Sequence, residues 1–436
     1  MPIPTPFHER TAPLCTSMRW KDWAGYHAVC SYGTYMPAEY FAIRHAAGLV
    51  DVTPLFKYDV RGRDAAAVLS RIMVRDITAL KVGQVVYSCW CDDDGKVVDD
   101  GTVWRLEEQY FRMTSAEPAI GWLMRFVRGC DVQIQDVSRQ IAALSLQGPN
   151  AREILKQVAG PELDRLRFFR LLRCRIAGSA GASPSRVARP PSAVGPSLVA
   201  SSFDAIITRT GYTGDLGYEI WVENRHALAL YDALLAAGKP HGLLPAGLDA
   251  QDVCRVEAGF ILNGVDYYSA PHCLIEKRKS TPYELDLGWM VKLDREPFVG
   301  QAALRREHAR GPRRVLVGLE IDWDHFAALH AEHGLPPEVP TAAWRTPVPV
   351  YDARGRQVGY ATSGVWSPTL KKNLALATVR PAFGKVGTEL RFEVTVEYER
   401  RLCKAFAAAK PFFDPERKKA TPGGERVESA PGSSER

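Results

Sequence analysis

A glycine-rich turn followed by a carboxylate is the part of the sequence best suited to binding a polar ligand. The run 211–220 contains three glycines, and Glu219 opens an alternating stretch at its end. A period of two places Glu219, Trp221 and Glu223 on one face of a strand. An ionised carboxylate accepts adjacent N–H donors as a fork, whereas a solvated strand face is the ordinary alternative. We therefore take Glu219 as a candidate binding residue.

A second candidate is the pair Asp99 and Asp100, which ends a predicted strand starting at Val97. Consecutive side chains of a strand point to opposite faces, so only one carboxylate can enter a given cavity. The preceding strand, predicted over 84–91, is connected to this one by Asp92-Asp93-Asp94-Gly95, whose composition predicts a hairpin turn. An acidic dipeptide that closes a turn is the structural alternative to a catalytic role.

The elements that position these carboxylates are of mixed type. Helical spacing around Tyr40 to Ala47 is followed by a predicted strand over 50–60, and strands and helices alternate irregularly up to about residue 290. This irregular order of strands and helices favours an α+β fold over a regular parallel sheet. From Arg313 onward, short strands and turns predict a small β-barrel or sandwich. The excursion 322–344 interrupts these strands and is a candidate for shaping a substrate entrance.

Two stretches lack the pattern of a packed core. Residues 178–200 are rich in Gly, Ala, Ser and Pro and have no apolar periodicity, which predicts a disordered surface insertion. The polar C-terminal residues predict a disordered tail. The expected division is 1–310 for the α+β region with its insertion, 311–412 for the barrel and 413–436 for the tail.

Composition narrows the class of protein. Hydrophobic residues make up 46% and charged residues 24%, as in a globular chain. The sequence contains neither an 18-residue apolar run nor a leader-like N-terminus, so we expect neither a membrane span nor export. A net charge of +6 without a basic stripe argues against a nucleic-acid partner. The nine cysteines show no metal-ligand spacing, so no metal is predicted. The expected location is the cytoplasm.

Several short motifs, separated by long intervals, occur in a fixed order along the chain. They are Gly95 to Gly101, Ser145 to Pro149, Gly211 to Ile220, Arg255 to Gly259 and Thr362 to Asn373. Together they resemble the aminomethyltransferase family, the T-protein of the glycine cleavage system and its tetrahydrofolate-dependent relatives. The resemblance runs from about Thr5 to about Pro411. It implies a multi-domain folate-binding fold with two subdomains before a C-terminal β-barrel, and tetrahydrofolate as the cofactor.

The resemblance also assigns roles to residues. Asp100 matches the catalytic acid of the family motif, which would orient the accepting amine, relay its proton and stabilise a cationic one-carbon intermediate. Asp99 then belongs to the cofactor site as the neighbour that faces the surrounding structure. Glu219 matches the residue that grips the pterin edge. Tyr87 and Leu55 match an aromatic and an apolar residue that line the same pocket, although either type is also ordinary in a core.

Two positions of the expected cofactor site depart from the family pattern. Gln251 stands where the family usually has arginine, and a neutral amide cannot replace a guanidinium fork on a carboxylate. Ser115 stands where the glycine cleavage enzymes tend to have asparagine. Both departures bear on the one-carbon donor more than on the pterin site.

The implied function is a tetrahydrofolate-dependent one-carbon transferase. An aminomethyltransferase would take its group from a lipoyl-bearing carrier protein and release ammonia. A related demethylase would take a methyl group from a small sulfur, oxygen or nitrogen compound, which Gln251, Ser115 and the 322–344 excursion favour. We place the aminomethyltransferase first.

A non-catalytic folate-binding protein, such as the iron–sulfur cluster assembly factors that resemble this fold, is the alternative from another class. Those proteins carry a Lys-Gly-Cys-Tyr motif after the helix that bears a glutamate, whereas this chain has Phe260 to Tyr267 there. A fused flavin domain is also disfavoured, because no Gly-x-Gly-x-x-Gly follows a strand.

Overall fold

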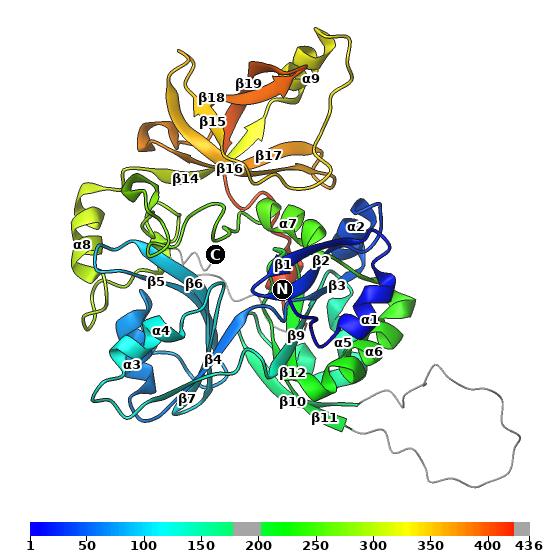
Figure 1. The fold of residues 1–436 in the computed structure, drawn as a ribbon, viewed down its shortest axis with the longest axis vertical. Helices are drawn as coiled ribbons and strands as arrows, with labels where there is room; N and C mark the ends of the chain where they lie inside the picture. Colours follow the sequence, from blue (N-terminus) through cyan, green and yellow to red (C-terminus); the bar gives the residue numbers. More distant parts are fainter. Residues whose placement is uncertain (178–201, 423–436) are drawn as a thin grey trace, which may run out of the picture.

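The computed structural model describes residues 1–177 and 202–422, and these form three bodies around a common centre (Figure 1). Two are mixed sheets with helices, and the third is a closed barrel at the C-terminal end. A short hairpin of β1 (Arg19–Trp23) and β2 (Tyr26–Ser31) lies near the centre. This arrangement confirms the predicted α+β class with a C-terminal barrel.

The first body is a six-stranded sheet in the order β10-β11-β12-β9-β3-β13. On β12, Tyr218, Ile220 and Val222 pack with the cluster that contains the surrounding helices, whereas Trp221 packs on the opposite side. The predicted alternation around Glu219 is thus confirmed. The strands are β3 (Ala47–Asp51), β9 (Ile141–Gln147), β10 (Leu171–Ala177), β11 (Ser202–Thr208), β12 (Gly217–Glu223) and β13 (Leu243–Pro245). The helices are α1 (His8–Thr11), α2 (Pro37–His45), α5 (Ala151–Ala159), α6 (Ala227–Gly238) and α7 (Leu248–Glu257).

The second body is a five-stranded sheet in the order β5-β6-β7-β4-β8. Its β5 and β6 are the predicted hairpin, paired antiparallel with Cys89 opposite Asp100, and Gly95 in the turn has a φ of 72°. The strands are β4 (Phe56–Arg61), β5 (Val85–Cys91), β6 (Val97–Glu107), β7 (Tyr110–Ser115) and β8 (Gln133–Asp136). The helices are α3 (Ala65–Ile72), α4 (Ile120–Leu123) and α8 (Gln301–Arg310), the last of which packs near the hairpin turn.

The third body is a closed barrel in the order β14-β17-β16-β15-β18-β19. Its strands are β14 (Val315–Ile321), β15 (Val348–Tyr351), β16 (Gln357–Ser367), β17 (Lys372–Val379), β18 (Glu389–Val396) and β19 (Glu399–Ala408). The excursion 322–344 begins as a helix, α9 (Trp323–Ala331), which Asp322 caps by accepting from the His325 N–H. It packs on the barrel, and none of its residues lines the main cavity described below.

The strand predicted over 50–60 is wrong. The segment divides into the end of β3 and the start of β4, which belong to different sheets. Pro54 lies in the turn between them and cannot donate a ladder hydrogen bond, so a continuous strand is disfavoured. This turn is the point where the chain crosses from one body to the other.

The C-terminal segment differs from the expected tail. Residues 413–422 pack on the first body, where the buried Arg209 donates to the carbonyl oxygens of Lys418 and Ala420 at 3.1 and 2.6 Å. Polar composition misled the prediction, because main-chain carbonyl oxygens and the charged side chain of Arg417 supply contacts to this segment. The rest of the tail and the predicted insertion 178–200 lie outside the described residues. In the described part of the chain, no helix is both long and apolar enough to span a bilayer.

Candidate functional site

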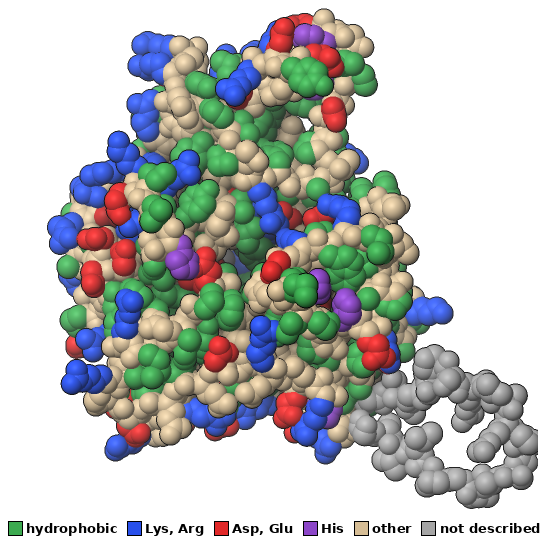
Figure 2. Space-filling view, in the orientation of Figure 1, with side chains coloured by type: hydrophobic (Ala, Val, Ile, Leu, Met, Phe, Trp, Pro, Cys, Tyr) green, Lys and Arg blue, Asp and Glu red, His purple; other side chains and the backbone are tan. Residues whose placement is uncertain are grey.

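A cavity of about 590 Å³ opens where the three bodies meet. Its wall combines residues from β1, β5, β6, β12, α7, the barrel and the C-terminal segment. Figure 2 shows a hollow below the barrel in the middle of this face. The volume lies within the range of small-molecule sites. All the predicted site residues except Asp99 line this cavity, namely Leu55, Tyr87, Asp100, Ser115, Glu219 and Gln251.

Glu219 enters the cavity from β12. Its Oε2 accepts hydrogen bonds from the hydroxyls of Thr210 at 2.8 Å and Thr208 at 3.5 Å. No described residue donates to its Oε1. Burial raises the pKa of the carboxyl group, and the two threonines oppose that rise. The threonines therefore hold one oxygen in place, and the other remains available to a donor in the cavity.

The glycine-rich turn before β12 allows the chain to pass close to α7. Gly214 has a φ of 72°, and a Cβ atom there would lie 2.5 Å from the Cβ of Ala258. Tyr212 in the same turn lines the cavity and stacks on Phe260 at a ring distance of 5.7 Å. The glycines thus bring an aromatic wall and Glu219 to the same cavity.

Asp100 enters the cavity from the second body. The Tyr87 hydroxyl donates to its Oδ2 at 2.7 Å, and the Tyr267 hydroxyl donates to its Oδ1. Burial raises the pKa of this carboxyl group, whereas the two tyrosine hydrogen bonds lower it. Two hydroxyls on two oxygens fix the plane of the carboxylate.

Asp99 lies behind Asp100, as the strand alternation predicts. Its Oδ2 accepts the N–H groups of Ala116 and Glu117 at 3.1 and 2.9 Å, and its Oδ1 accepts from Asn263 at 2.9 Å. Burial, followed by the adjacent charge of Asp100, raises the pKa of Asp99 to about 7. Asp99 thus connects β6 to the loops after β7 and α7. The separation from Asp100 is incomplete, because Tyr267 also reaches Asp99 at 3.3 Å.

Leu55 lies in the turn between β3 and β4, and a buried lysine holds that turn. The Lys57 ammonium donates to the carbonyl oxygens of Thr53 at 2.6 Å and Leu55 at 2.8 Å. Burial lowers its pKa from 10.5 to about 7. Either protonation state of the amine has hydrogens to donate, so the turn remains supported on both sides of that pKa.

We expect Lys57 to impose a pH dependence on stability. Its pKa is lower in the folded chain, so the unfolded chain binds more protons between about pH 7 and 10.5. The free energy of unfolding should therefore rise across this window by up to a few kcal/mol more in the native protein than in Lys57→Met. Urea denaturation of both proteins at several pH values measures the two slopes. Equal slopes would contradict the assigned pKa, even if Lys57→Met is less stable throughout.

The two departures from the family pattern both lie at the cavity. The Ser115 hydroxyl turns toward the backbone and donates to the Glu117 carbonyl oxygen at 2.6 Å. Gln251 lies on α7 and is 7% exposed, and its side-chain amide forms no hydrogen bond with the described residues. Of the two, only Gln251 presents an unpaired polar group.

Several contributors to the site were missed at the level of sequence. Tyr267 holds Asp100, Asn263 holds Asp99, and Arg345 brings a cation from the barrel to the cavity wall. Each lies far along the chain from the residue it joins. No local motif carries that information, and the fold alone brings these residues together.

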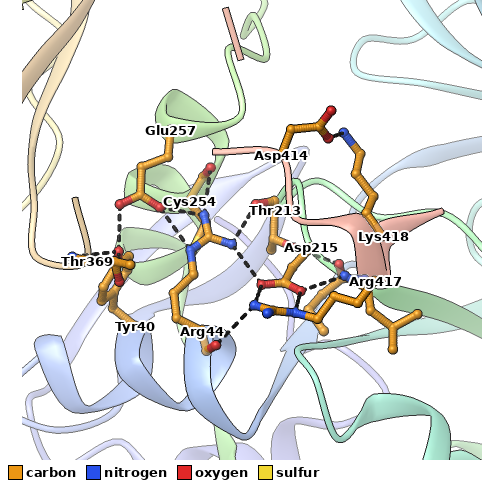
Figure 3. A network of polar contacts seen from close by, with 12 residues as sticks. Tyr40, Arg44, Thr213, Asp215, Cys254, Glu257, Thr369, Asp414, Arg417 and Lys418 are labelled. Atoms are coloured by element: carbon orange, nitrogen blue, oxygen red, sulfur yellow. Dashed lines mark hydrogen bonds and ion pairs between the residues drawn. The ribbon is translucent and has the colours of Figure 1, made fainter. Parts of the chain in front are cut away.

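A buried ionic network fixes the wall of the cavity next to the C-terminal segment (Figure 3). The Arg44 guanidinium has no exposed surface and donates to Glu257 Oε2 at 2.9 Å and to the Thr213 carbonyl oxygen at 2.9 Å. Arg417 of the C-terminal segment pairs with Asp215 through bonds of 2.7 and 2.8 Å. The cavity lining includes Asp215. The network therefore ties α2, α7 and the glycine-rich turn to the last described residues.

The same network reaches the barrel. Glu257 Oε1 accepts from Tyr40 at 2.6 Å and from Ser367 of β16 at 2.5 Å, and the Tyr40 hydroxyl also contacts Thr369 at 2.8 Å. Every charged group in this cluster has a partner, which is the condition for burying it. These bonds therefore connect α2 and α7 to the barrel.

Comparisons with known proteins agree with this architecture. The model of the GCVT N-terminal domain matches residues 7–189 and 197–295, and that of the glycine cleavage T-protein C-terminal barrel domain matches 314–414. Proteins named aminomethyltransferase from Bacillus pumilus and Caldanaerobacter subterraneus are each 32% identical to the chain. The alignments cover 90% and 91% of this chain and 94% and 93% of those proteins.

The fold also matches a solved structure. The crystal structure of glycine cleavage system aminomethyltransferase T from Bartonella henselae aligns with a TM-score of 0.75 at 24% identity. The alignment covers 95% of this chain and 99% of that one. At this level of identity, the likeness concerns the fold.

Proposed function

The chain belongs to the glycine cleavage T-protein family, and on that premise we propose that it is a tetrahydrofolate-dependent aminomethyltransferase. The observation that carries the proposal is that one cavity is lined by a carboxylate from each of two sheets. Asp100 comes from the five-stranded sheet and Glu219 from the six-stranded sheet. A cytoplasmic location goes with the proposal.

The residues present fit a reduced pterin. Glu219 Oε1 takes no hydrogen bond from the described residues, so it is free to accept N–H donors of a heterocycle edge. Leu55 and Tyr212 supply apolar and aromatic surface for a flat ring. When bound, tetrahydrofolate supplies the amine nitrogen that accepts the one-carbon unit.

Asp100 is the residue that stabilises charge during the reaction. Its carboxylate, held by Tyr87 and Tyr267, orients an amine N–H and accepts or relays its proton. It also stabilises positive charge that develops as the carbon moves. The two tyrosines keep the oxygens in one orientation, so little reorganisation is needed in the transition state.

The identity of the donor distinguishes two candidate reactions. The aminomethyltransferase would receive its group from a lipoyl-bearing carrier protein. The second candidate, a demethylase of a small methylated compound, is favoured by the unpaired amide of Gln251, which stands where the family usually has a charged fork.

One experiment tests the function. The purified protein is titrated with tetrahydrofolate by calorimetry and is then supplied with an aminomethyl-lipoyl carrier protein or with methylated small molecules, while the folate product is quantified. Turnover with the carrier supports the aminomethyltransferase, and turnover with only a methylated compound supports the demethylase. Binding without turnover of any donor supports the non-catalytic alternative, and absence of tetrahydrofolate binding would sink all three.

Glu219→Gln should weaken tetrahydrofolate binding by roughly ten- to a hundred-fold, because a neutral amide loses a charge-assisted fork. Isothermal calorimetry measures the change in Kd. Glu223→Gln is the matched control, since Glu223 lies on the same strand but is exposed and pairs with Arg225. Equal affinities of Glu219→Gln and Glu223→Gln, with both proteins folded, would remove Glu219 from the site.

A further inference from the structure

One corner of the cavity gathers polar side chains from three separate segments of the fold. Lys21 comes from β1, Gln251 from α7 and Arg345 from the segment that leads into β15 of the barrel. All three line the cavity. Figure 2 shows basic side chains along the edge of the hollow below the barrel.

Lys21 is a cation without a counter-charge in contact. Its ammonium forms no hydrogen bond or ion pair with any described residue, although its side chain is half-buried. Burial, followed by the nearby Arg345 guanidinium, lowers its pKa, and the smaller effects of Asp252 and Asp249 oppose that change without reversing it. Two cations near each other in a partly buried wall repel, so this arrangement is unfavourable without an anion.

Arg345 presents most of its donors to the cavity. Its Nε donates to Asp252 Oδ2 at 2.7 Å, and its two Nη atoms form no hydrogen bond with the described residues. Its side chain retains 36% exposure. The anchoring contact leaves the outer part of the guanidinium open to a ligand.

The carboxylates nearby do not neutralise this corner. Asp252 is shared, because its other oxygen accepts from Arg255 at 2.6 Å. Arg255 in turn pairs with the buried Asp266 at 2.6 Å. Asp249 also lies near Lys21, but it pairs with Arg19 at 2.7 Å. Among these described residues, the four cations Lys21, Arg345, Arg255 and Arg19 therefore exceed the three carboxylates Asp252, Asp266 and Asp249 by one charge.

From this charge and geometry we infer that Lys21, Arg345 and Gln251 form a binding corner for a carboxylate group of a small-molecule ligand. The ammonium and the guanidinium supply charge, and the free amide of Gln251 supplies a neutral donor. The inference rests on the proposed function for its setting in the one-carbon site. The carboxylate belongs either to the one-carbon donor or to the glutamyl part of the folate, and both present the same chemistry.

The test begins with a probe that does not involve folate. Benzoate and benzamide have nearly the same flat shape and differ in charge, and calorimetry measures the affinity of each. The native protein should prefer benzoate, and Lys21→Met and Arg345→Met should each reduce that preference roughly ten-fold. Arg63→Gln is the control, because Arg63 pairs with Asp131 at the surface and does not line the cavity.

A second set of titrations identifies the source of the carboxylate. Tetrahydrofolate carries glutamyl carboxylates and 6-methyltetrahydropterin carries no carboxylate, so a loss confined to tetrahydrofolate in Lys21→Met assigns the corner to the cofactor. If both pterins bind Lys21→Met as they bind the native protein, while KM for a methylated amino acid rises and KM for the matching methylated amine does not, the corner belongs to the donor.

The two proposals fail in different ways. Absence of tetrahydrofolate binding by the native protein would remove the proposed function but leave the preference for benzoate intact. Equal benzoate affinities in the native protein, Lys21→Met and Arg345→Met would overturn the carboxylate corner and leave folate binding untouched. Lys21→Met is the decisive variant, since no described contact of the ammonium is lost and the fold should be retained.

Discussion

Asp100→Asn is expected to lower turnover by roughly a hundred-fold or more, while the Kd for tetrahydrofolate changes little. The reason is that the accepting nitrogen develops positive charge and loses its proton only while the carbon is transferred. Asparagine preserves the shape of the side chain and its contact with one tyrosine hydroxyl, but it can neither accept a proton nor balance the charge. Steady-state kinetics with the active donor, together with calorimetric titration of the folate, measures the two quantities.

Asp99→Asn provides the comparison for this prediction. Asp99 accepts backbone N–H groups from the loop after β7, so its loss should appear as a lower free energy of unfolding more than as slower chemistry. A larger kinetic loss in Asp99→Asn than in Asp100→Asn, at equal folded fractions, would show that the other carboxylate carries the reaction. The loss of turnover in Tyr267→Phe should lie between the losses in Asp99→Asn and Asp100→Asn, because this change removes the hydrogen bond to one oxygen of Asp100.

Arg44→Met should reduce the free energy of unfolding by about 3–5 kcal/mol, the usual result of removing one partner from a buried ion pair. Among the described residues, Glu257 then has no cationic partner and Asp215 keeps Arg417 alone. Urea denaturation measures the loss, and a second substitution, Glu257→Gln, should recover part of it because the unpaired charge is removed.

Arg10→Met is the surface counterpart of this variant. Arg10 pairs with Asp232, and their side chains are 32% and 36% exposed, so its loss should amount to about 1 kcal/mol or less. If Arg44→Met is as mild as Arg10→Met, the network in Figure 3 does not hold the wall of the cavity.

The sequence predicted those parts of the site that follow a local period. Alternation along β12 placed Glu219 and Trp221 on the side opposite Ile220, and alternation along β6 separated Asp100 from Asp99. The β5–β6 hairpin followed from its turn composition. Where a strand pattern ran through a change of sheet, at Pro54, the same local reasoning failed, because residues 50–60 have strand-like side chains on both sides of the turn.

The rest of the site depends on contacts between distant segments. Tyr267 meets Asp100 across 167 positions, and Arg417 meets Asp215 across 202. The sequence gives no sign that Arg345 reaches the cavity, because the preceding residues 322–344 pack on the barrel. Such partners are selected by the topology of the three bodies, and a single sequence contains no periodic signal for them.

The C-terminal segment has a consequence for the order in which the protein is made. Lys410, Asp414 and Lys418 form part of the cavity wall, and Arg417 secures that wall to Asp215. Both sheets leave the ribosome well before these residues and can fold first. A nascent chain therefore has its carboxylates in place while one side of its pocket is still missing. Ligand binding should begin only after these residues have been synthesised and packed against Asp215, so the ligand cannot assist the folding of the sheets before that point.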